Sequence, residues 1–289
     1  MKFCLKCETS FVATTWSCPK CGAQPQEIGG WLSFAPDLAS DAGYKDSFFD
    51  ELVDLEANNF WFRARNKLIV WALKRYFAGA NQFLEIGCGT GFVLSGVGAS
   101  LPELVLSGSE ISTEGLAHAA HRVPGVNLFQ MDARAIPFNN EFDVIGAFDV
   151  IEHIEEDDVV LSQMHQAVRP GGGILLTVPQ HEFLWSAVDE HACHVRRYAA
   201  KDLVSKVRAA DFKVVRMTSF VSLLLPLMFA SRAMQSSRKE EYDPLGELRM
   251  NRFANAVLEK VAQVESMGIR AGLNFPAGGS LLLIARKIS

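Results

Sequence analysis

The chain has 289 residues, of which 49% are hydrophobic, and a formal net charge of −5 at pH 7. This length and hydrophobic content are enough for one large core and a small appendage, and the mild acidity argues against non-specific nucleic-acid binding, which relies on clustered lysine and arginine. The N-terminus shows no cationic start followed by an apolar run, and no uncharged apolar run reaches about 18 residues, so neither a secretory signal nor a membrane-spanning helix is expected. A cytoplasmic protein is therefore expected.

Four of the six cysteines fall in the first 21 residues, as two Cys-x-x-Cys pairs formed by Cys4 with Cys7 and by Cys18 with Cys21. Each pair can direct two thiolates at one ion, and four thiolates suit a closed, structural zinc site. Iron uses the same geometry, and the cysteines could instead be free thiols or form disulfides, although a reducing compartment disfavours disulfides. The pattern predicts a zinc ribbon over residues 1–24 that depends on its metal for stability. A stabilising cap, a docking module and a part of the substrate site remain alternative roles for it.

Residues 25–59 are predicted to form a linker, rich in glycine and proline, followed by an N-terminal helix. Helical periodicity runs from Asp46 to Phe77 and is divided by the segment Asn-Phe-Trp-Phe-Arg-Ala-Arg-Asn at residues 59–66.

Residues 83–91 read Phe-Leu-Glu-Ile-Gly-Cys-Gly-Thr-Gly, an apolar strand that leads directly into a glycine-rich loop. Glycine permits positive φ and a close approach of backbone to ligand, and such a loop before a helix binds nucleotide-like ligands in doubly wound sheets. The dinucleotide fingerprint requires glycine at its first, third and sixth positions, and the sixth position here is Phe92. This departure disfavours a dinucleotide-dependent oxidoreductase. An ordinary tight turn is the structural alternative.

Further apolar segments follow in order and are predicted to be strands. Their ranges are Leu104–Gly108, Val126–Gln130, Phe142–Phe148, Ile174–Val178, Phe212–Thr218 and Ser280–Arg286. An acid follows each of the first three, and the turn Arg-Pro-Gly-Gly-Gly at residues 169–173 precedes the fourth.

The glycine loop, the acids at the strand ends and the Pro-Gly-Gly turn occur in the order typical of class I S-adenosylmethionine-dependent methyltransferases. From about Phe60 to Ser289 the chain resembles this family, including its type 11 and type 12 members and the ubiquinone-biosynthesis O-methyltransferases. The resemblance implies an α/β fold over residues 60–289: a Rossmann-like, seven-stranded sheet with helices on both faces and an antiparallel last strand. It also implies S-adenosyl-L-methionine as cofactor and S-adenosylhomocysteine as product.

The resemblance further implies a set of cofactor-binding residues. In the family, the acid before the loop holds the cofactor's ammonium, the loop surrounds its methionine part, the next acid binds the ribose, the third binds adenine, and the fourth lies near the transferring methyl. An aromatic-then-arginine segment covers the cofactor in related enzymes, although packing on the core explains such a segment equally well. The candidates are Trp61, Arg65, Glu85, Gly87, Cys88, Gly89, Gly91, Glu110, Ile111, Asp132, Ala133, Asp149 and Val150. For Cys88 simple packing is the favoured interpretation, and for Glu110 a solvated acid at a helix start is the alternative.

Three histidines are candidates for the catalytic base. His153 follows Asp149 in the sequence Asp-Val-Ile-Glu-His, and a histidine near neutral pKa can remove a proton from a hydroxyl acceptor. His191 and His194 lie in residues 179–198, which resemble a segment of a bacterial and archaeal methyltransferase subgroup. A metal site that includes Cys193 is disfavoured because a fourth ligand is missing. Arg196 or Arg197 is expected to bind a negative group on the acceptor or to form a structural ion pair.

Residues 219–278 are predicted to form a helical insertion before the last strand. An apolar stretch over Phe220–Ala230 is followed by a charged stretch and then by helical periodicity over Phe253–Met267. A lid over the acceptor site is the favoured interpretation. Peripheral contact with a membrane or a lipid-linked substrate is the alternative.

The sequence therefore predicts transfer of a methyl group from S-adenosylmethionine to a small-molecule, glycan-linked or lipid-linked acceptor, at oxygen. The Asn-Pro-Pro-Tyr-type tetrapeptide that marks methylation of amide or exocyclic nitrogens is replaced by Asp-Val-Ile-Glu at residues 149–152. A non-catalytic zinc-ribbon adaptor that binds the cofactor and an RNA methyltransferase are the alternatives, although nucleic acid is disfavoured as a partner. The oligomeric state cannot be inferred from the sequence.

Overall fold

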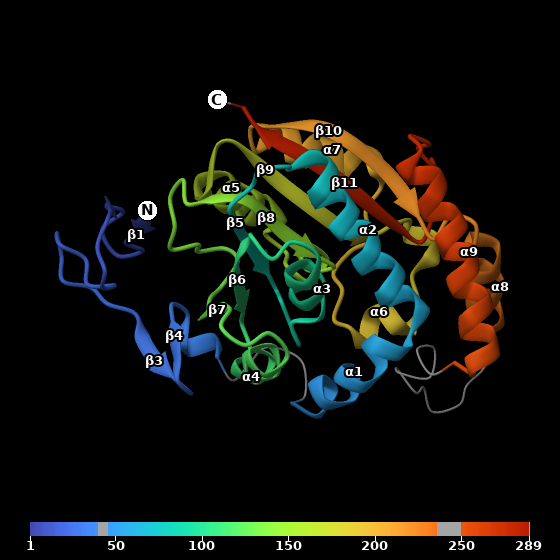
Figure 1. Cartoon of the computed structure of the whole chain (residues 1–289), viewed down its shortest axis with the longest axis horizontal. Helices are drawn as coiled ribbons and strands as arrows, with labels where there is room; N and C mark the ends of the chain where they lie inside the picture. Colours follow the sequence, from blue (N-terminus) through green and yellow to red (C-terminus); the bar gives the residue numbers. More distant parts are fainter. Residues whose placement is uncertain (40–45, 236–249, 289) are drawn as a thin grey trace.

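The computed structural model describes residues 1–39, 46–235 and 250–288 (Figure 1). At its centre is a nine-stranded mixed sheet with the strand order β10-β11-β9-β8-β5-β6-β7-β4-β3. The strands are β3 (Gln26–Ile28), β4 (Trp31–Ser33), β5 (Gln82–Ile86), β6 (Val105–Glu110), β7 (Asn127–Gln130), β8 (Phe142–Phe148), β9 (Val168–Pro179), β10 (Phe212–Phe220) and β11 (Ser280–Lys287). Strands β4 to β9 pair in parallel, and β11 lies antiparallel between β9 and β10.

Helices cover both faces of this sheet, as Figure 1 shows. The helices are α1 (Asp46–Asn58), α2 (Phe60–Tyr76), α3 (Phe92–Ser100), α4 (Thr113–Arg122), α5 (Asp157–Ala167), α6 (Ala187–His191), α7 (Ala200–Ala209), α8 (Leu225–Gln235) and α9 (Arg252–Arg270). Short 3-10 turns are η1 (Pro36–Leu38), η2 (Ile151–His153) and η3 (Glu182–Leu184).

Alternate strand residues enter two separate cores. Leu84 of β5 and Leu283 of β11 pack with α5 and α7 on one face, while Phe83 and Leu282 pack with α2, α3 and α4 on the other. Because both faces are buried, the strands are apolar without interruption, which is why they could be recognised in the sequence. The α/β fold predicted from the sequence is confirmed.

The sheet has two more strands than the seven predicted. Residues 26–33, predicted to be linker, form the hairpin β3-β4, and β4 pairs in parallel with β7. Gly29 and Gly30 both have positive φ (60° and 87°), the geometry of a two-residue hairpin turn, and Ser33 donates a hydrogen bond of 2.7 Å to Gln130. The sequence predicts a linker here, but the Gly-Gly pair forms the turn of a hairpin whose strand β4 covers the edge of β7.

The N-terminal segment is a small unit of its own, with β1 (Lys2–Phe3) paired to β2 (Ser10–Phe11). Phe3 donates a backbone hydrogen bond of 2.9 Å to Pro137, and Trp16 packs edge-on against Phe129 and Phe138. These contacts lie at the side of the sheet where β8 begins. In Figure 1 this segment and helices α8 and α9 lie at opposite ends of the molecule.

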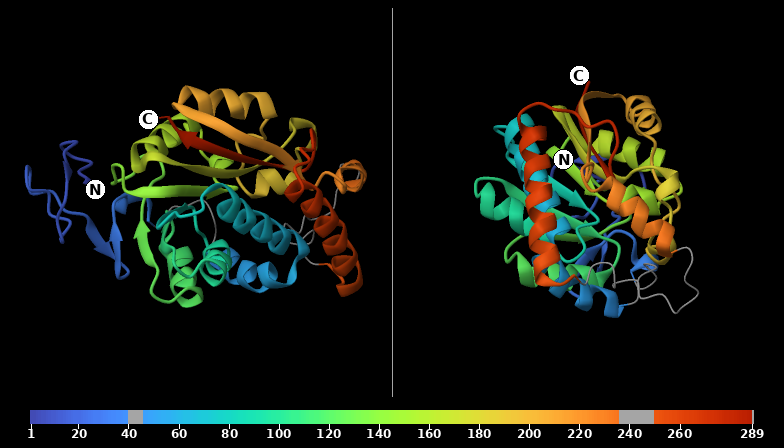
Figure 2. Two further views of the ribbon diagram at one scale, coloured as in Figure 1. Left: turned by 45° about the horizontal axis from the view of Figure 1, so that its top comes forward. Right: turned by 90° about the vertical axis from the view of Figure 1, so that its right-hand side faces the viewer.

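The predicted insertion contributes α8 and α9. Helix α9 begins at its N-cap Asn251 and packs along α2, as both views in Figure 2 show. The Asn255 side chain accepts a hydrogen bond of 2.8 Å from the Phe60 backbone, and Arg63 pairs with Glu259 at 2.6 Å. Much of the charged stretch of the insertion lies outside the described residues. In the described part of the chain, no helix is long and apolar enough to cross a membrane.

Candidate active site

The carboxyl ends of β5 to β9 meet at one edge of the sheet, and the loops that follow them carry most of the residues singled out in the sequence. In open α/β sheets ligands bind outside this edge, where the strand order reverses. The reversal occurs at β5, which lies between β6 and β8. The geometry around the end of β5 therefore decides which ligand can bind.

The loop after β5 bends through three glycines in the left-handed region, with φ of 64° at Gly87, 49° at Gly89 and 77° at Gly91. A Cβ at Gly87 would lie 2.5 Å from a methyl of Val150, and one at Gly91 would lie 2.9 Å from Cα of Ala119. A Cβ at Gly89 would meet no atom within 4 Å. The loop is therefore packed tightly at both ends and open in the middle, which makes it a backbone cradle.

Glu85 of β5 is buried, and its Oε2 has no hydrogen-bond partner among the described residues. Burial raises the pKa of this carboxyl well above its ordinary value, and the nearby guanidinium of Arg65 opposes the rise. Buried carboxyl oxygens usually have a hydrogen-bond partner. A ligand cation, such as an ammonium, would supply that partner.

Asp149 directly follows β8 and has a φ of 58°, a left-handed conformation that aspartate tolerates better than most residues. Its carboxylate pairs with Arg65 of α2 and accepts a hydrogen bond of 3.0 Å from the Thr177 hydroxyl. The turn places Val150 against Gly87, so the ends of β5 and β8 constrain one another.

Glu110 ends β6, and its carboxylate accepts backbone hydrogen bonds from Gly89 at 2.9 Å and Ile111 at 2.8 Å. Burial raises the pKa of Glu110, while these bonds oppose the rise. The carboxylate thus reaches across to the glycine loop, where a ligand on the loop would meet it.

Asp132 follows β7, and both of its oxygens are engaged by Arg134, whose Nη2 lies 2.9 Å from Oδ2. The neighbouring Ala133 is buried. Arg134 itself is exposed and also pairs with Glu156 at 3.0 Å, so the Asp132 carboxylate lies at the rim of the site.

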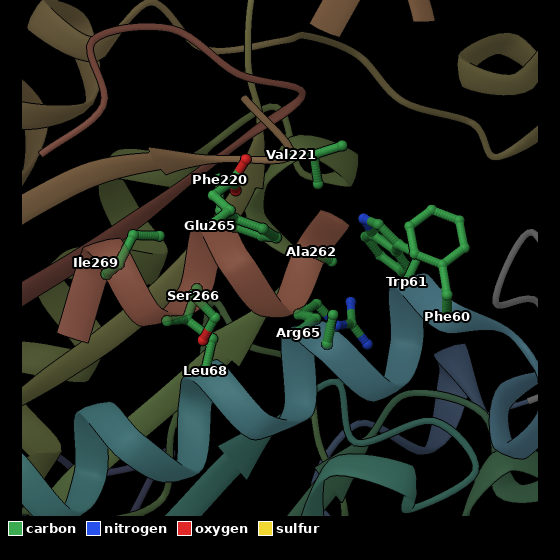
Figure 3. Close-up of a pocket in the computed structure, with 11 residues that line it drawn as sticks. Phe60, Trp61, Arg65, Leu68, Phe220, Val221, Ala262, Glu265, Ser266 and Ile269 are labelled. Atoms are coloured by element: carbon green, nitrogen blue, oxygen red, sulfur yellow. The ribbon is translucent and has the colours of Figure 1, made fainter. Parts of the chain in front are cut away.

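A pocket opens between α2, α9 and the end of β10 (Figure 3). Trp61 and Arg65 line it from α2, with the guanidinium 4.5 Å from the centre of the Trp61 ring. The other lining residues are Phe60, Ala64, Leu68, Phe220, Val221, Ala262, Glu265, Ser266 and Ile269. Because Arg65 also pairs with Asp149, this largely apolar pocket adjoins the strand-end site.

Two residues that sequence reasoning missed, Glu56 and Arg122, hold the glycine loop through its own Thr90. Thr90 donates a hydrogen bond of 2.6 Å to the buried Glu56 of α1, and Arg122 of α4 pairs with Glu56 and bonds to the Thr90 carbonyl at 3.2 Å. This contact joins α1 and α4 to the loop. Only spatial proximity reveals it, since the three residues are far apart in sequence.

The structure brings two of the three candidate histidines together. The rings of His153 and His194 meet edge-on with centroids 4.7 Å apart, whereas His191 at the end of α6 is exposed and lies outside this cluster. Burial lowers the pKa of His153 to about 4, and the neighbouring His194 adds to the effect. Nδ1 of His194 lies 2.9 Å from the buried Asp189, a partner that the sequence analysis did not identify.

The two candidate arginines of this segment form ion pairs within the protein. Arg197 bonds to Asp189 at 2.7 Å and to the Gln180 carbonyl, and Arg196 pairs with Asp157 at 3.1 Å and bonds to the Ile154 carbonyl. Although burial opposes it, the contacts with His194 and Arg197 hold the pKa of Asp189 at about 2. Both arginines therefore order the segment that carries His194.

The four N-terminal cysteines form one cluster. All four sulfurs lie within 4.8 Å of one another, with 3.6 Å between Cys4 and Cys21 and 3.6 Å between Cys7 and Cys18. Sulfurs on a tetrahedral zinc ion are separated by about 3.8 Å. The cluster is consistent with the predicted zinc site.

Comparisons with known proteins agree with this geometry. Residues 83–172 match the family model of a methyltransferase domain. A probable S-adenosylmethionine-dependent methyltransferase of Mycolicibacterium smegmatis is 28% identical over 163 residues, which cover 55% of this chain and 62% of that protein. The phthiotriol/phenolphthiotriol dimycocerosates methyltransferase of Mycobacterium tuberculosis is 29% identical over 126 residues, 41% of this chain and 45% of that protein. The chain thus spans less than two thirds of the length of these relatives.

A solved structure extends the match to the fold. Phosphoethanolamine N-methyltransferase 2 of Haemonchus contortus, in complex with S-adenosyl-L-methionine, shares a TM-score of 0.58 and 20% identity with this chain, covering 88% of it and 60% of that protein. At this identity the likeness shows the fold alone.

The residues of the site fit the cofactor that these relatives name. The cofactor's amino acid part carries an ammonium, and Glu85 presents a buried oxygen without a donor beside a loop that is open at Gly89. The matched residues 83–172 include both features, together with Glu110 at the end of β6 and with Asp132 and Asp149, which follow β7 and β8.

Proposed function

We propose that this chain, in which residues 83–172 form a methyltransferase domain of the class I fold, moves a methyl group from S-adenosylmethionine to an acceptor oxygen. The main support for the proposal is the glycine loop, which is open at Gly89 and lies beside Glu85. Glu85 is buried, and its Oε2 accepts no hydrogen bond from the described residues. Most buried polar groups in proteins are hydrogen-bonded, and a ligand ammonium would supply the partner of this oxygen.

In this proposal Glu85 accepts hydrogen bonds from the cofactor's ammonium, and the backbone of Gly87, Cys88, Gly89 and Gly91 surrounds its methionine part. Glu110, beside Ile111, accepts from the ribose hydroxyls, and Asp132 and Ala133 contact adenine. A carboxylate has about four lone-pair sites, so Glu110 and Asp132 keep acceptor capacity beside their present partners. Asp149 and Val150 lie beside the methyl group that the cofactor transfers.

In this proposal Arg65 of α2 also contacts the cofactor. Its guanidinium offers five donors in a planar fork, of which Asp149 uses only part. A cofactor carboxylate can therefore share Arg65 with Asp149, while Trp61 holds the guanidinium from its other side.

When bound, the cofactor supplies an already electrophilic methyl carbon. The chain's own residues then have to position the acceptor in line with it, exclude water and receive one proton from the acceptor hydroxyl. Among the candidate bases, His153 follows Asp149 by one short turn and His194 packs against His153, while His191 is exposed. We assign handling of the acceptor's proton to the His153–His194 pair.

The acceptor class is a small molecule or a lipid-linked compound. Supporting this, the pocket beside Arg65 is lined mainly by apolar side chains, and the similar mycobacterial enzyme is named for a lipid acceptor. Exposed apolar side chains also gather on α8 and α9, among them Phe229, Phe253 and Met267. Peripheral membrane contact through these helices predicts co-sedimentation with liposomes that is reduced in Phe253→Ser. Equal sedimentation of both proteins would remove membrane contact from the proposal.

Calorimetric titration with S-adenosylhomocysteine, with NADH as control, tests the proposed function. We expect binding of the first ligand alone, with at least a tenfold loss in Glu85→Gln and in Asp132→Ala and no loss in Glu103→Gln, a change at an exposed acid. Equal affinity in all four proteins would refute the assigned site. Transfer of labelled methyl from the cofactor into an extract component would then exclude the non-catalytic adaptor.

A further inference from the structure

Three polar side chains lie in one row at the carboxyl ends of neighbouring parallel strands. Gln130, the last residue of β7, pairs in register with Ser33 at the end of β4 and with Glu110 at the end of β6. Residues in register on parallel strands place their side chains on the same face of the sheet, and adjacent strands are about 4.8 Å apart. Gln130 therefore lies between the hairpin β3-β4 and the acid assigned to the ribose.

The Gln130 side chain is fully buried and uses all of its hydrogen-bonding capacity. Its Oε1 accepts from the Ser33 hydroxyl at 2.7 Å and from the Ala35 backbone at 3.1 Å, and its Nε2 donates to the carbonyls of Ala35 at 2.9 Å and Ile111 at 3.0 Å. A glutamine amide has two N–H donors and an oxygen with two lone pairs, so all four positions are filled. The opposite orientation of the amide would turn its oxygen towards two carbonyls. The network therefore requires a glutamine in one orientation.

The bond to the Ile111 carbonyl reaches the segment that follows β6. The Ile111 N–H donates to the Glu110 carboxylate at 2.8 Å, so the backbone of this residue is held from both sides. The Met131 backbone donates to the Glu110 carbonyl at 3.1 Å, and Asp132 follows directly. The two segments assigned to the adenosine part of the cofactor are thereby joined to each other, with Gln130 between them.

The hairpin supplies three of the four bonds of the Gln130 side chain, one from Ser33 and two from Ala35. The Phe34 backbone also donates to the Gln130 carbonyl at 2.8 Å. Ser33 is 0% exposed, and a hydroxyl buried in this way needs a partner inside the protein. Residues that were predicted to be linker thus hold a side chain behind the cofactor site.

We propose that Gln130 positions the adenosine half of the cofactor site, and that the hairpin β3-β4 holds Gln130 in place through Ser33 and Ala35. Gln130 is a positioning residue, because with 0% of its surface exposed it acts on the cofactor only through Ile111 and the chain that leads to Asp132. Binding residues have to be held within about 0.5 Å of their productive geometry, so a loss of this support lowers affinity. The positioning role rests on the proposed function, while the hydrogen bonds of Gln130 do not.

Calorimetric titration of the whole chain with S-adenosylhomocysteine tests this role. Gln130→Met keeps the length of the side chain and removes all four bonds, and we expect a loss of affinity of about tenfold. Gln166→Met is the matched control, because the Gln166 amide donates to the Phe138 carbonyl at 3.1 Å on the side of the sheet where β8 begins. It should lower the stability of the protein but leave the affinity within about twofold of the unsubstituted value.

A second ligand shows which half of the cofactor site is affected. 5′-Methylthioadenosine contains the adenosine part of S-adenosylhomocysteine but neither its ammonium nor its carboxylate. Gln130→Met should weaken the binding of both ligands by the same factor. Glu85→Gln should weaken the binding of S-adenosylhomocysteine alone.

A double-mutant cycle tests whether the hairpin acts through Gln130. Ser33→Ala removes one of the four bonds and should lower the affinity by about two- to threefold. In the Gln130→Met background the same substitution should cause no further loss, because the side chain through which Ser33 acts is already absent.

The outcomes distinguish this role from the proposed function. A folded Gln130→Met protein that binds S-adenosylhomocysteine as the unsubstituted protein does would refute the positioning role and leave the proposed function standing. If Gln130→Met does not fold, Ser33→Ala decides, since an unchanged affinity in that variant would also refute the role. Equal losses from Ser33→Ala in both backgrounds would refute the action of the hairpin through Gln130. If the unsubstituted protein binds neither ligand, the proposed function fails and the positioning role fails with it.

Discussion

Arg65, in the second turn of α2, forms an ion pair with Asp149, which lies 84 residues later at the end of β8. The pair joins a helix that precedes the matched domain to the strand end where methyl transfer is proposed. It also places a cation beside Glu85, and Trp61 stacks on that cation from the pocket side. One arginine thereby connects the cofactor cradle, the acceptor side and the apolar pocket.

Replacement of Arg65 by Ala should destabilise the protein by about 3 kcal/mol, because it leaves Asp149 partly buried without its counter-charge. Arg63→Ala is the matched control. It breaks the more exposed pair with Glu259 and should cost at most about 1 kcal/mol. Denaturant unfolding of the two variants measures both values. Similar losses of stability in the two variants would show that the Arg65–Asp149 pair stabilises the protein no more than the Arg63–Glu259 pair does.

Binding of S-adenosylhomocysteine should release protons. Burial raises the pKa of Glu85 well above its ordinary value in the free protein, so the carboxyl keeps its proton at pH values below that raised pKa. The ligand's ammonium favours the ionised form and lowers the pKa, and a proton leaves in the window between the bound and the free pKa. The calorimetric enthalpy should therefore vary with the ionisation enthalpy of the buffer. The variation should disappear in Glu85→Gln and also above the free-state pKa. Buffer-independent enthalpies in the unsubstituted protein would contradict the assignment of the ammonium to Glu85.

Gly87→Ala should lower the affinity for the cofactor more than tenfold and lower the stability of the protein. Residue 87 has a φ of 64°, which disfavours any side chain, and a Cβ there would lie 2.5 Å from a methyl of Val150. Gly125→Ala separates the effect of the positive φ from that of the clash. Gly125 has a similar φ of 83°, but a Cβ there would meet no atom within 4 Å. This substitution should therefore lower the stability of the protein by only about 1–2 kcal/mol and leave the cofactor affinity unchanged. Val150→Ala in the Gly87→Ala background should recover part of the stability. If the double variant is no more stable than Gly87→Ala, the Val150 contact is not the cause.

Cys18→Ser should remove one tightly bound zinc ion per chain, measured by elemental analysis, and weaken the folding of residues 1–24. The affinity for S-adenosylhomocysteine should stay within about twofold, since the N-terminal segment contacts Pro137 and Phe138 before β8 begins, and the cradle lies at the other end of the strands. Unfolding of the whole chain on loss of zinc would instead assign the ribbon a role in the main core.

The strands were predictable because a parallel sheet buried on both faces leaves uninterrupted apolar runs. The run Phe142–Phe148 has the same bounds as β8, and Ser280–Arg286 falls one residue short of β11. The hairpin β3-β4 was not predictable in the same way, because its strands are only three residues long and half exposed, and its Gly-Gly turn resembles a linker. Whether those residues pair with β7 depends on an edge that exists only in the folded sheet.

The fold class, the glycine cradle, the order of the strand-end acids and the cysteine tetrad could be predicted from the sequence, because each is a local pattern whose spacing along the chain reflects its geometry. Which side chains meet depends on the folded chain. The tertiary structure separated His191 from His153 and His194, paired Arg197 with Asp189, and left Glu152 buried without a partner among the described residues, between segments more than 30 residues apart. Those contacts depend on the packing of loops at the ends of β8 and β9, which no local pattern of residues encodes.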